Sequence, residues 1–451
     1  MRSHVRRYPT PGHTYYYDAT AGNDAARGSG EDAPLQTVAG LNAKALRPRD
    51  RVLFKRGEAW SGTDWVVAVS GKAGAPITFG AYGAGALPAI TGQNHAAETL
   101  AADGQGYLAF RDLDIAGSAN SNFAIRLQDC RDVTLTRVTA RDAHVYFGIY
   151  VNDTGVGKTL RPVVEDCTVH GNHATGLAVQ YNGVALPLRG PAEIAVLHNT
   201  VYSNGTAADA DHGMYLRECT SGVVLGNSAY SNPVGAGIKL NTCTGLLVEG
   251  NHCYSNKHGM VASAEYAATC ACRVVNNVLD HNAVDGFQTL ANANGMTFAG
   301  NTVVDNVGKA IDMYNDVTGW VFSSNVLYQD KNDGVNAWSS FCVNMAAGST
   351  NLVNNTWDYN DLVYISSWAG NATLCQIGVV TYTLVQWQAL GGSPEVHGTG
   401  VAPVFVTNWS NFHLQAASGL RGIGDTAVGL MRDYDGVPRG VAVDIGAYEY
   451  V

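Results

Sequence analysis

The sequence has no long apolar run and little charge. Its 451 residues contain no stretch of 18 apolar residues, so it predicts no membrane-spanning helix. Only 15% of the residues are charged, and 28 basic residues against 38 acidic ones give a net charge of −10. A negative chain is poorly suited to general nucleic-acid binding. We therefore expect neither a membrane nor a nucleic acid as a partner.

Two further patterns are missing, a signal peptide and a Cys-x-x-Cys pair. The first residues are basic but contain no apolar segment. We nevertheless expect an extracellular protein, secreted or associated with a phage particle. The nine cysteines are an odd number, and Cys270 and Cys272 make only a weak metal pattern. Cys219 and Cys243 hold the same place in neighbouring repeats, so they form either a disulfide or unbridged core.

The chain does contain a repeat, a six-residue phrase that starts with asparagine and ends with asparagine, or with Asp330 in the last copy. It begins at six positions: Asn199, Asn227, Asn251, Asn277, Asn301 and Asn325. The starts are 28, 24, 26, 24 and 24 residues apart, a period typical of solenoids. The short alternating apolar segments predict strands with one inward face. Asn and Gly fit turns that need left-handed backbone.

These features predict an all-β fold, a single-stranded right-handed parallel β-helix. Stacked coils place like residues about 4.8 Å apart, so the asparagines should form one ladder inside a turn. A leucine-rich repeat has a similar period, but its L-x-x-L-x-L consensus is missing.

We divide the chain into four parts. They are a disordered lead (1–13), an N-terminal cap with the first coils (14–100), a parallel β-helix with a groove (101–375), and C-terminal coils with a cap (376–451). Leu35, Val38 and Leu41 have the spacing of a short helix that covers the open end of the solenoid. Segments 51–57, 76–80 and 88–92 are predicted strands. The order of these elements resembles the opening of secreted carbohydrate-active β-helix proteins.

Three longer coils predict a groove. Most repeats have a strand that begins with a glycine, as in Gly237-Ile-Lys-Leu240. Insertions around 153–162, 181–192 and 207–211 should protrude beside this strand. Loops on a rigid scaffold commonly carry binding groups.

Alternation after these glycines predicts three columns of outward side chains. The residues two after the glycine are Tyr150, Ala178, Tyr215, Lys239, Val261, Gln288, Asp312 and Asn336. Two residues further on are Asn152, Gln180, Arg217, Asn241, Ser263, Leu290, Tyr314 and Trp338. Directly before the glycine are His212, His258, Asp285, Lys309 and Asp333. This mixture suits a bound sugar polymer, and the predicted substrate-binding residues are Tyr150, Asn241, His258, Asp285, Gln288, Asp312 and Tyr314.

Lys239 is the candidate catalytic base. Repulsion from Arg217 in the preceding coil would favour its neutral amine, the form that accepts a proton. β-Elimination on a uronate needs this base, a cation at the carboxylate, and an acid or water at the leaving oxygen. Calcium or Arg217 can supply the cation, and His212 or Tyr215 the acid.

Two family resemblances bear on this site. Gly237-Ile-Lys-Leu240 resembles the segment that carries the base lysine in family-nine polysaccharide lyases, the calcium-dependent β-helix pectate lyases. That resemblance implies a calcium site before the lysine, for which Asp209 and Asp211 are the candidates. His212-Gly213 and Ile238-Lys239 are more weakly similar to elements of the β-helix polygalacturonases.

The leading prediction is therefore a polysaccharide lyase that cleaves an acidic, uronate-containing glycan, with calcium as a tentative cofactor. A glycoside hydrolase that uses Asp285 and Asp312 is the first alternative. A non-catalytic glycan-binding tailspike or adhesin is the second. We expect a monomer or a homotrimer.

Overall fold

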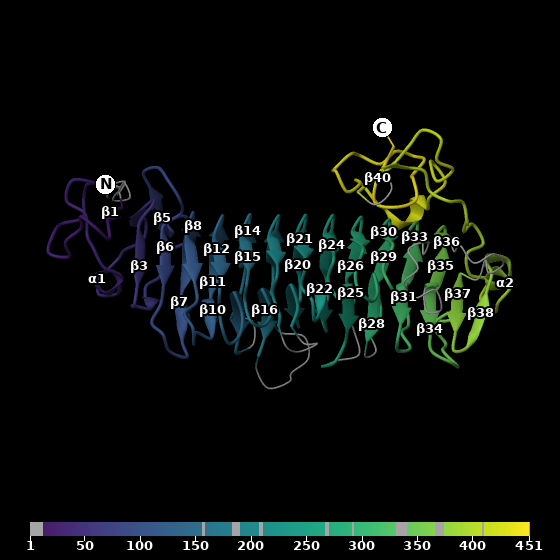
Figure 1. The fold of residues 1–451 in the computed structure, drawn as a ribbon, viewed down its shortest axis with the longest axis horizontal. Coiled ribbons are helices and arrows are strands. Elements are labelled where there is room, and N and C mark those ends of the chain that lie inside the picture. Colours follow the sequence, from purple (N-terminus) through teal and green to yellow (C-terminus); the bar gives the residue numbers. More distant parts are fainter. Residues whose placement is uncertain are drawn as a thin grey trace, which may run out of the picture.

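The chain winds into a right-handed parallel β-helix, as the repeat predicts (Figure 1). A computed structural model describes residues 12–155, 158–182, 190–206, 211–266, 270–290, 293–330, 341–365, 374–407 and 410–450. The predicted disordered lead, residues 1–13, lies almost entirely outside these ranges. Within them, no helix has both the length and the apolar character needed to cross a bilayer.

Each coil contributes one strand to each of three long sheets. Sheet A contains β1 (Thr14–Tyr17), β2 (Arg51–Lys55), β5 (Ile77–Tyr82), β8 (Gly106–Arg111), β11 (Arg131–Thr136), β14 (Val163–Glu165), β17 (Ile194–Leu197), β20 (Gly222–Leu225), β23 (Leu246–Glu249), β26 (Arg273–Val275), β29 (Thr297–Ala299), β32 (Val321–Ser323) and β35 (Thr356–Asp358). Sheet B contains β3 (Ala59–Ser61), β6 (Ala89–Thr91), β9 (Asp114–Ala116), β12 (Thr139–Arg141), β15 (Thr168–His170), β18 (Thr200–Tyr202), β21 (Ser228–Tyr230), β24 (His252–Tyr254), β27 (Val278–Asp280), β30 (Thr302–Val304), β33 (Val326–Asp330) and β36 (Asp361–Ile365).

Sheet C carries the candidate site. It contains β4 (Trp65–Val67), β7 (Glu98–Asp103), β10 (Phe123–Gln128), β13 (Ile149–Asp153), β16 (Leu177–Tyr181), β19 (Met214–Arg217), β22 (Ala236–Asn241), β25 (His258–Ser263), β28 (Phe287–Leu290), β31 (Lys309–Met313), β34 (Phe341–Met345), β37 (Cys375–Ile377) and β38 (Val380–Tyr382). The last pair, β37 and β38, is antiparallel. The predicted strands near the N-terminus are confirmed as β2, β5 and β6.

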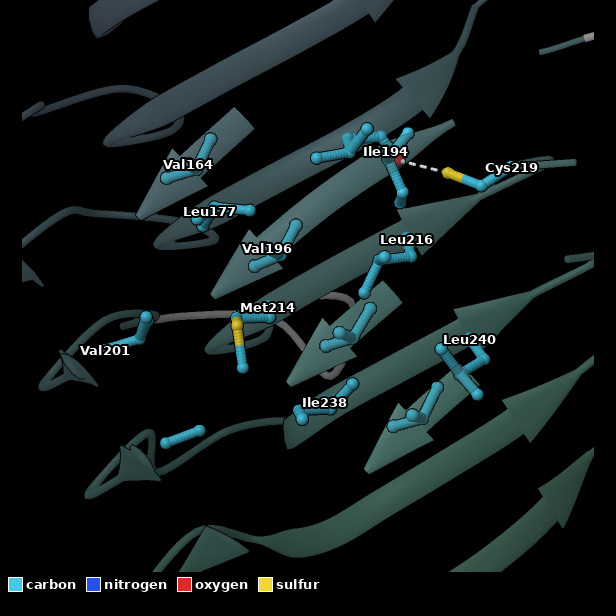
Figure 2. Close-up of a cluster of buried hydrophobic side chains, with 14 of the residues drawn as sticks. Val164, Leu177, Ile194, Val196, Val201, Met214, Leu216, Cys219, Ile238 and Leu240 are labelled. Carbon is cyan, nitrogen blue, oxygen red and sulfur yellow. Dashed lines mark hydrogen bonds between the residues drawn. The ribbon is translucent and has the colours of Figure 1, made fainter. Parts of the chain in front are cut away.

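The inward side chains of the three sheets form one continuous apolar core. Figure 2 shows a section in which Val164 and Val196 from sheet A meet Val201 from sheet B and Leu216 from sheet C. Removing such side chains from water is the main force that holds successive coils together. Cys219 and Cys243 belong to this core as buried free thiols, and burial is the first cause of the raised pKa of Cys243.

A left-handed residue turns the chain directly before each ladder asparagine. Gly226, Gly250 and Gly300 hold this position with φ of 63°, 62° and 62°. Glycine adopts this backbone without steric cost. The asparagine that follows is then free to point into the coil.

The predicted asparagine ladder is confirmed. Each ladder asparagine donates its side-chain amide to the Oδ1 of the next, as from Asn251 to Asn277 at 2.9 Å and from Asn277 to Asn301 at 3.0 Å. All six predicted asparagines are buried. A second ladder follows sheet B, with members Asn172, Asn204, Asn232, Asn256, Asn282 and Asn306.

Glu395 ends the first ladder. The Nδ2 and the backbone N–H of Asn360 donate to its two carboxylate oxygens at 2.6 and 3.0 Å. Burial raises the pKa of Glu395 to about 8 from its ordinary 4.5, although these hydrogen bonds from Asn360 oppose the rise.

This raised pKa predicts a pH-dependent stability. Between pH 4.5 and about 8 the folded chain holds a proton on Glu395 that the unfolded chain has lost. The stabilising contribution is therefore complete below pH 4.5 and is lost as the pH rises through about 8. Glu395→Gln cannot ionise, so we expect its melting temperature to fall less than that of the wild type as the pH rises from 4.5 to about 8, although its amide leaves one of the two Asn360 donors without an acceptor. Thermal melts across the pH range test this, with the exposed Glu193→Gln as the control; identical pH profiles for Glu395→Gln and the wild type would contradict it.

The two ends of the solenoid are covered differently. Helix α1 (Val38–Asn42), capped by Thr37, places Val38 and Leu41 on the first coils, as predicted, while Leu35 instead bridges to β1. At the other end, α2 (Leu384–Gln388) buries Trp387 in the core.

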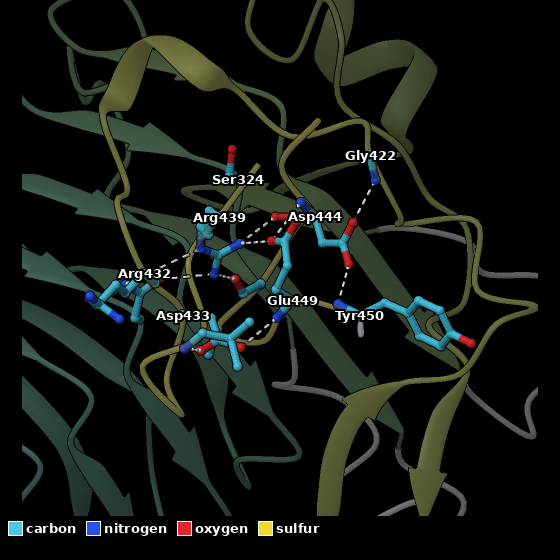
Figure 3. Close-up of polar contacts among 12 residues, drawn as sticks. Ser324, Gly422, Arg432, Asp433, Arg439, Asp444, Glu449 and Tyr450 are labelled. Carbon is cyan, nitrogen blue, oxygen red and sulfur yellow. Dashed lines mark hydrogen bonds and ion pairs between the residues drawn. The ribbon is translucent and has the colours of Figure 1, made fainter. Parts of the chain in front are cut away.

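The remaining C-terminal residues fold back along the solenoid (Figure 1). The hairpin of β39 (Phe405–Thr407) and β40 (Asn411–Leu414) packs on outward apolar side chains of sheet B, and the short 3₁₀ helix η1 (Thr426–Val428) follows it. The fully buried Arg439 side chain pairs with Glu449 at 3.0 Å and donates to Asn276 Oδ1 at 3.0 Å, which ties this segment to the edge of sheet A (Figure 3). The segment thus lies on sheets A and B, and sheet C keeps its own outer face.

Candidate functional site on sheet C

The strand register places the predicted columns on the outer face of sheet C. In the strand register, Lys239 lies between Tyr215 of the preceding coil and Val261 of the next coil. Arg217 and Asn241 are likewise neighbours in the second column. Asn336, Trp338 and Asp333 lie outside the described residues, and Asn344 of β34 pairs with Asp312 in the place predicted for Asn336.

Lys239 has a partner that the sequence reasoning missed. Its ammonium forms an ion pair with Glu265 Oε1 at 2.9 Å, and its side chain is only 12% exposed. The expectation that repulsion from Arg217 dominates at Lys239 is therefore wrong. Arg217 instead stacks its guanidinium on the ring of Tyr266 at 3.8 Å. The charge nearest to Lys239 is therefore the Glu265 carboxylate.

Asn241 joins Glu265 to Tyr215. Its Nδ2 donates to Glu265 Oε2 at 2.8 Å and to the Tyr215 hydroxyl at 2.9 Å. Burial alone would raise the pKa of Glu265, but the hydrogen bond and charge of Lys239, together with Asn241, hold that pKa below its usual range. Glu265 is therefore ionised at neutral pH.

Tyr215 lies beside Lys239 and retains its proton. The lysine Nζ is 5.7 Å from the centre of the tyrosine ring. Burial raises the pKa of Tyr215 against the opposing hydrogen bond from Asn241. The hydroxyl is thus a proton donor held next to the candidate base.

His212 does not fit the predicted role of an acid. Burial, with the charges of Lys239 and His258, holds the pKa of His212 well below its usual range. Its Nδ1 accepts a hydrogen bond from the backbone N–H of Ala236 at 3.0 Å. The ring is therefore neutral with its proton on Nε2, and it can donate a hydrogen bond but has no spare proton to give.

Asp312 lies in the outward column of sheet C next to Gln288, but both Asp312 and Asp285 are buried. Gln288 lies between them and donates Nε2 to Asp285 Oδ2 at 3.3 Å and to Asp312 Oδ2 at 3.2 Å. Asp312 also accepts from Asn344 at 2.6 Å, and Asp285 lies 3.3 Å from His258 Nδ1. Because Gln288 Nε2 lies 3.3 Å from Asp285 Oδ2 and 3.2 Å from Asp312 Oδ2, these two oxygens are at most 6.5 Å apart. That distance is the lower limit of the roughly 6.5–9.5 Å between carboxyl groups that an inverting hydrolase needs.

A pocket of about 140 Å³ opens beside Lys239. Its lining includes His212, Lys239, Lys257, His258 and Gln288. Lys239 and Lys257 line it together with His258 and the neutral His212, in a chain with an overall net charge of −10. The local charge therefore suits an anionic group, which the bulk composition did not indicate.

The other predicted binding residues lie at different depths. Tyr150 is buried, and its hydroxyl accepts from Gln180 Nε2 at 3.0 Å. Tyr314 follows β31 and is 64% exposed. The predicted groove walls fall partly outside the described residues, at 156–157, 183–189 and 207–210.

The described residues do not supply a calcium site. Asp209 lies outside them, and Asp211 is half-buried. Among the residues that the structure describes, no three His, Cys, Asp or Glu side chains gather into a metal-binding group. The sheet positions one and two coils before Lys239 hold Tyr215, Arg217, Ala178 and Gln180. Calcium takes about 6–8 oxygen ligands, which this set does not provide.

Chelation tests the calcium prediction directly. If Asp209 and Asp211 bind the ion, excess EGTA lowers the melting temperature of the wild type and added calcium restores it. The Asp211→Asn variant should then melt at the same temperature with and without EGTA. If EGTA changes neither the melting temperature nor the activity of the wild type, calcium has no part in the mechanism. Arg217 would then be the group that neutralises the substrate carboxylate.

Alternation explains which site residues were found and which were missed. Lys239, Tyr215 and Asn241 lie within strands, where the period of two fixes the face. Glu265 lies two residues beyond Ser263, just past the end of β25, and extending the second column by one step would have found it. Lys257 precedes β25 in a turn, where no periodicity applies.

Known proteins share this architecture. Residues 124–327 match the sequence profile of the family described as right handed beta helix region. The GH136 lacto-N-biosidase from Eubacterium ramulus superposes with a TM-score of 0.59 at 20% identity, covering 82% of this chain and 68% of that chain. The chain has the fold of carbohydrate-active β-helix proteins.

Two other solved structures cover almost the whole chain. Pectate lyase Pel9A has a TM-score of 0.56 at 15% identity, over 98% of this chain and 97% of that one. XylC, solved in complex with xylose, has a TM-score of 0.55 at 10% identity, over 97% and 98%. No curated protein matches the sequence. At these identities the likenesses show the fold, and the reaction must be argued from the site.

Proposed function

We propose that the chain is a polysaccharide lyase that cleaves a uronate-containing glycan by β-elimination, with Lys239 as the base. The observation that carries this proposal is the basic pocket at Lys239, in which Lys257 and His258 accompany a lysine that lies next to a protonated tyrosine. The fold shared with pectate lyase Pel9A supports it.

The reaction assigns one role to each group. The neutral amine of Lys239 removes the proton on the carbon next to the uronate carboxylate. The electrons of that C–H bond form a carbon–carbon double bond, and the bond to the leaving glycosidic oxygen breaks. Tyr215 can give its proton to that oxygen. Arg217 and His258 can stabilise the negative charge that develops at the carboxylate.

Screening polysaccharides for two products tests this function. A lyase produces unsaturated chain ends that absorb ultraviolet light, whereas a hydrolase produces reducing ends without that absorbance. We expect both new chain ends and absorbance. Reducing ends alone would favour the hydrolase alternative at Asp285 and Asp312, and binding without either product would favour the tailspike or adhesin.

Glu265 is the charged group nearest to the candidate base Lys239. A lysine accepts a proton only as the neutral amine, so activity should rise with pH. Glu265→Gln removes that charge and keeps an oxygen that can accept from Asn241. We expect the midpoint of the pH profile of kcat/KM to move to lower pH, the direction that follows from the loss of an opposite charge 2.9 Å from the candidate base.

The control for this profile is Glu193→Gln. Glu193 is an exposed carboxylate 3.8 Å from Arg161, and its side chain is 59% exposed. Its substitution should leave the midpoint where it is. A midpoint that stays fixed or moves to higher pH in Glu265→Gln would show that Lys239 is not the titrating base.

The other expectations about the protein's setting remain proposals. An extracellular location, secreted or on a phage particle, fits an enzyme that acts on a polysaccharide. A monomer or a homotrimer, without a nucleic acid or a membrane as partner, is consistent with that setting.

A further inference from the structure

Four aromatic rings cluster at the start of β10 and β13, on the same sheet as Lys239. The ring of Phe123 is stacked on that of Tyr150 at 4.7 Å and on that of Tyr146 at 5.7 Å. Phe147 contacts Phe123 at 5.7 Å and Tyr150 at 5.2 Å. Tyr146 is 48% exposed and its neighbour Val145 is 37% exposed. The cluster therefore offers apolar surface to solvent and is not wholly core.

The cluster lies in line with the candidate active site. Tyr150 occupies the same outward column as Lys239, three strands away along sheet C. Phe147 directly precedes Gly148, as His212 precedes Gly213, and backbone hydrogen bonds connect these coils. Three coil spacings amount to about 14 Å. A polymer that lies along the solenoid axis with one sugar at Lys239 of β22 extends toward β13 and β10, which follow in the same sheet (Figure 1).

The charges around the rings differ from those of the Lys239 pocket. Arg126 is the cation next to Tyr150 in the register, and it is paired with Glu98 at 3.0 Å and with Asp103 at 3.0 Å. Two carboxylates thus oppose one guanidinium. This part of the face does not favour a second uronate, whereas the pocket at Lys239 has two lysines in its lining, of which Lys239 is paired with Glu265.

Aromatic rings and balanced charge are the chemistry of a site for an uncharged sugar. The C–H groups on one face of a pyranose ring pack against the negative face of an aromatic ring, and the burial of both apolar surfaces is favourable. Contiguous exposed apolar surface of this kind commonly marks a ligand-binding groove.

We propose that Tyr146, Phe123 and Phe147, supported by the buried Tyr150, form a second subsite of the same groove, which binds an uncharged sugar residue of the substrate. The substrate is then a mixed glycan, with uronate and neutral sugars in one chain, and not a homopolymer of uronate. This inference rests on the proposed function, because it takes the uronate to bind at Lys239.

Binding to an inactive variant tests the subsite without cleavage. The parent is Lys239→Ala, and the probes are short and long oligosaccharides from polygalacturonate and from a polysaccharide in which uronate alternates with a neutral sugar. Calorimetry gives each Kd. We expect the parent to bind long mixed oligosaccharides most tightly. Adding Tyr146→Ala should weaken that binding roughly two- to tenfold, the usual range for one aromatic contact, and leave short oligosaccharides unchanged.

Tyr450→Ala is the matched control. Tyr450 is 38% exposed and its ring also packs on a side chain, that of Arg421, but it lies in the C-terminal segment. Its substitution should not change any Kd. Equal affinity of the parent and the Tyr146→Ala double variant for long oligosaccharides would overturn the subsite. Equal affinity of the parent for polygalacturonate and the mixed glycan would overturn its specificity for an uncharged sugar.

Turnover by the single variants separates the two proposals. If Lys239→Ala is inactive but Tyr146→Ala changes no affinity, the lyase stands and the subsite fails. If Lys239→Ala still cleaves the glycan while Tyr146→Ala weakens binding, the subsite stands and the proposed base fails. Binding to no polysaccharide would overturn both.

Discussion

Lys239→Ala is expected to lower turnover roughly 10²–10⁴-fold, the usual loss when a general base is removed. The same substitution should change the melting temperature very little. The side chain lies outside the core, and the Glu265 carboxylate that it leaves behind is 38% exposed, so water can solvate it. Lys239→Arg should lose nearly as much activity, because a guanidinium stays protonated at any working pH.

The control for this loss is another lysine in an ion pair. Lys55 contacts Asp18 at 2.6 Å in the first coils, far from the pocket. Lys55→Ala should retain full turnover. If Lys239→Ala also retained it, while Asp285→Asn or Asp312→Asn abolished it without loss of the fold, the lyase would be replaced by the hydrolase. Circular dichroism melts are needed alongside, since both aspartates are buried.

The fold was predictable because its determinants are local and repeated. Glycine and asparagine positions fix each turn, and alternation fixes which side chains face the core. A period in the twenties then leaves few architectures. The second asparagine ladder was present in the same six-residue phrase, whose last residues are Asn204, Asn232 and Asn256.

The site was predictable only as far as alternation reaches. It placed Lys239, Tyr215 and Asn241 on one face, but it could not say what covers that face. The burial of Asp285 and His212 depends on neighbouring coils and turns, whose lengths vary. Glu265 lies one step of the alternation past Ser263, at the end of the strand, so its face could have been predicted, but its ion pair with Lys239 is a tertiary contact that alternation alone does not specify.

The other large effect is expected in the ladder, at Asn277. Its Nδ2 contacts three acceptors: Val248 O at 3.0 Å, Val275 O at 2.9 Å and Asn301 Oδ1 at 3.0 Å. Its Oδ1 accepts from the backbone and side chain of Asn251, both at 2.9 Å. Asn277→Ala removes these five hydrogen bonds and leaves the buried backbone N–H of Asn251 without its acceptor, whereas Asn301 Oδ1 still accepts from the backbone N–H of residue 277. At about 1 kcal/mol for each lost hydrogen bond, the unfolding free energy should fall by roughly 3 kcal/mol or more.

Two further variants show whether this loss comes from the buried hydrogen bonds of the ladder. Asn120 also donates to an asparagine one coil away, Asn94, at 2.9 Å, but both are exposed. Asn120→Ala should therefore cost less than about 0.5 kcal/mol of unfolding free energy.

Asn277→Asp should destabilise at least as much as Asn277→Ala, because a carboxylate facing three acceptor oxygens has no proton to donate. Glu395 escapes that conflict because it accepts both hydrogen bonds from Asn360 at the ladder's last step. Urea denaturation that gave Asn277→Ala and Asn120→Ala the same midpoint would show that the ladder adds no stability.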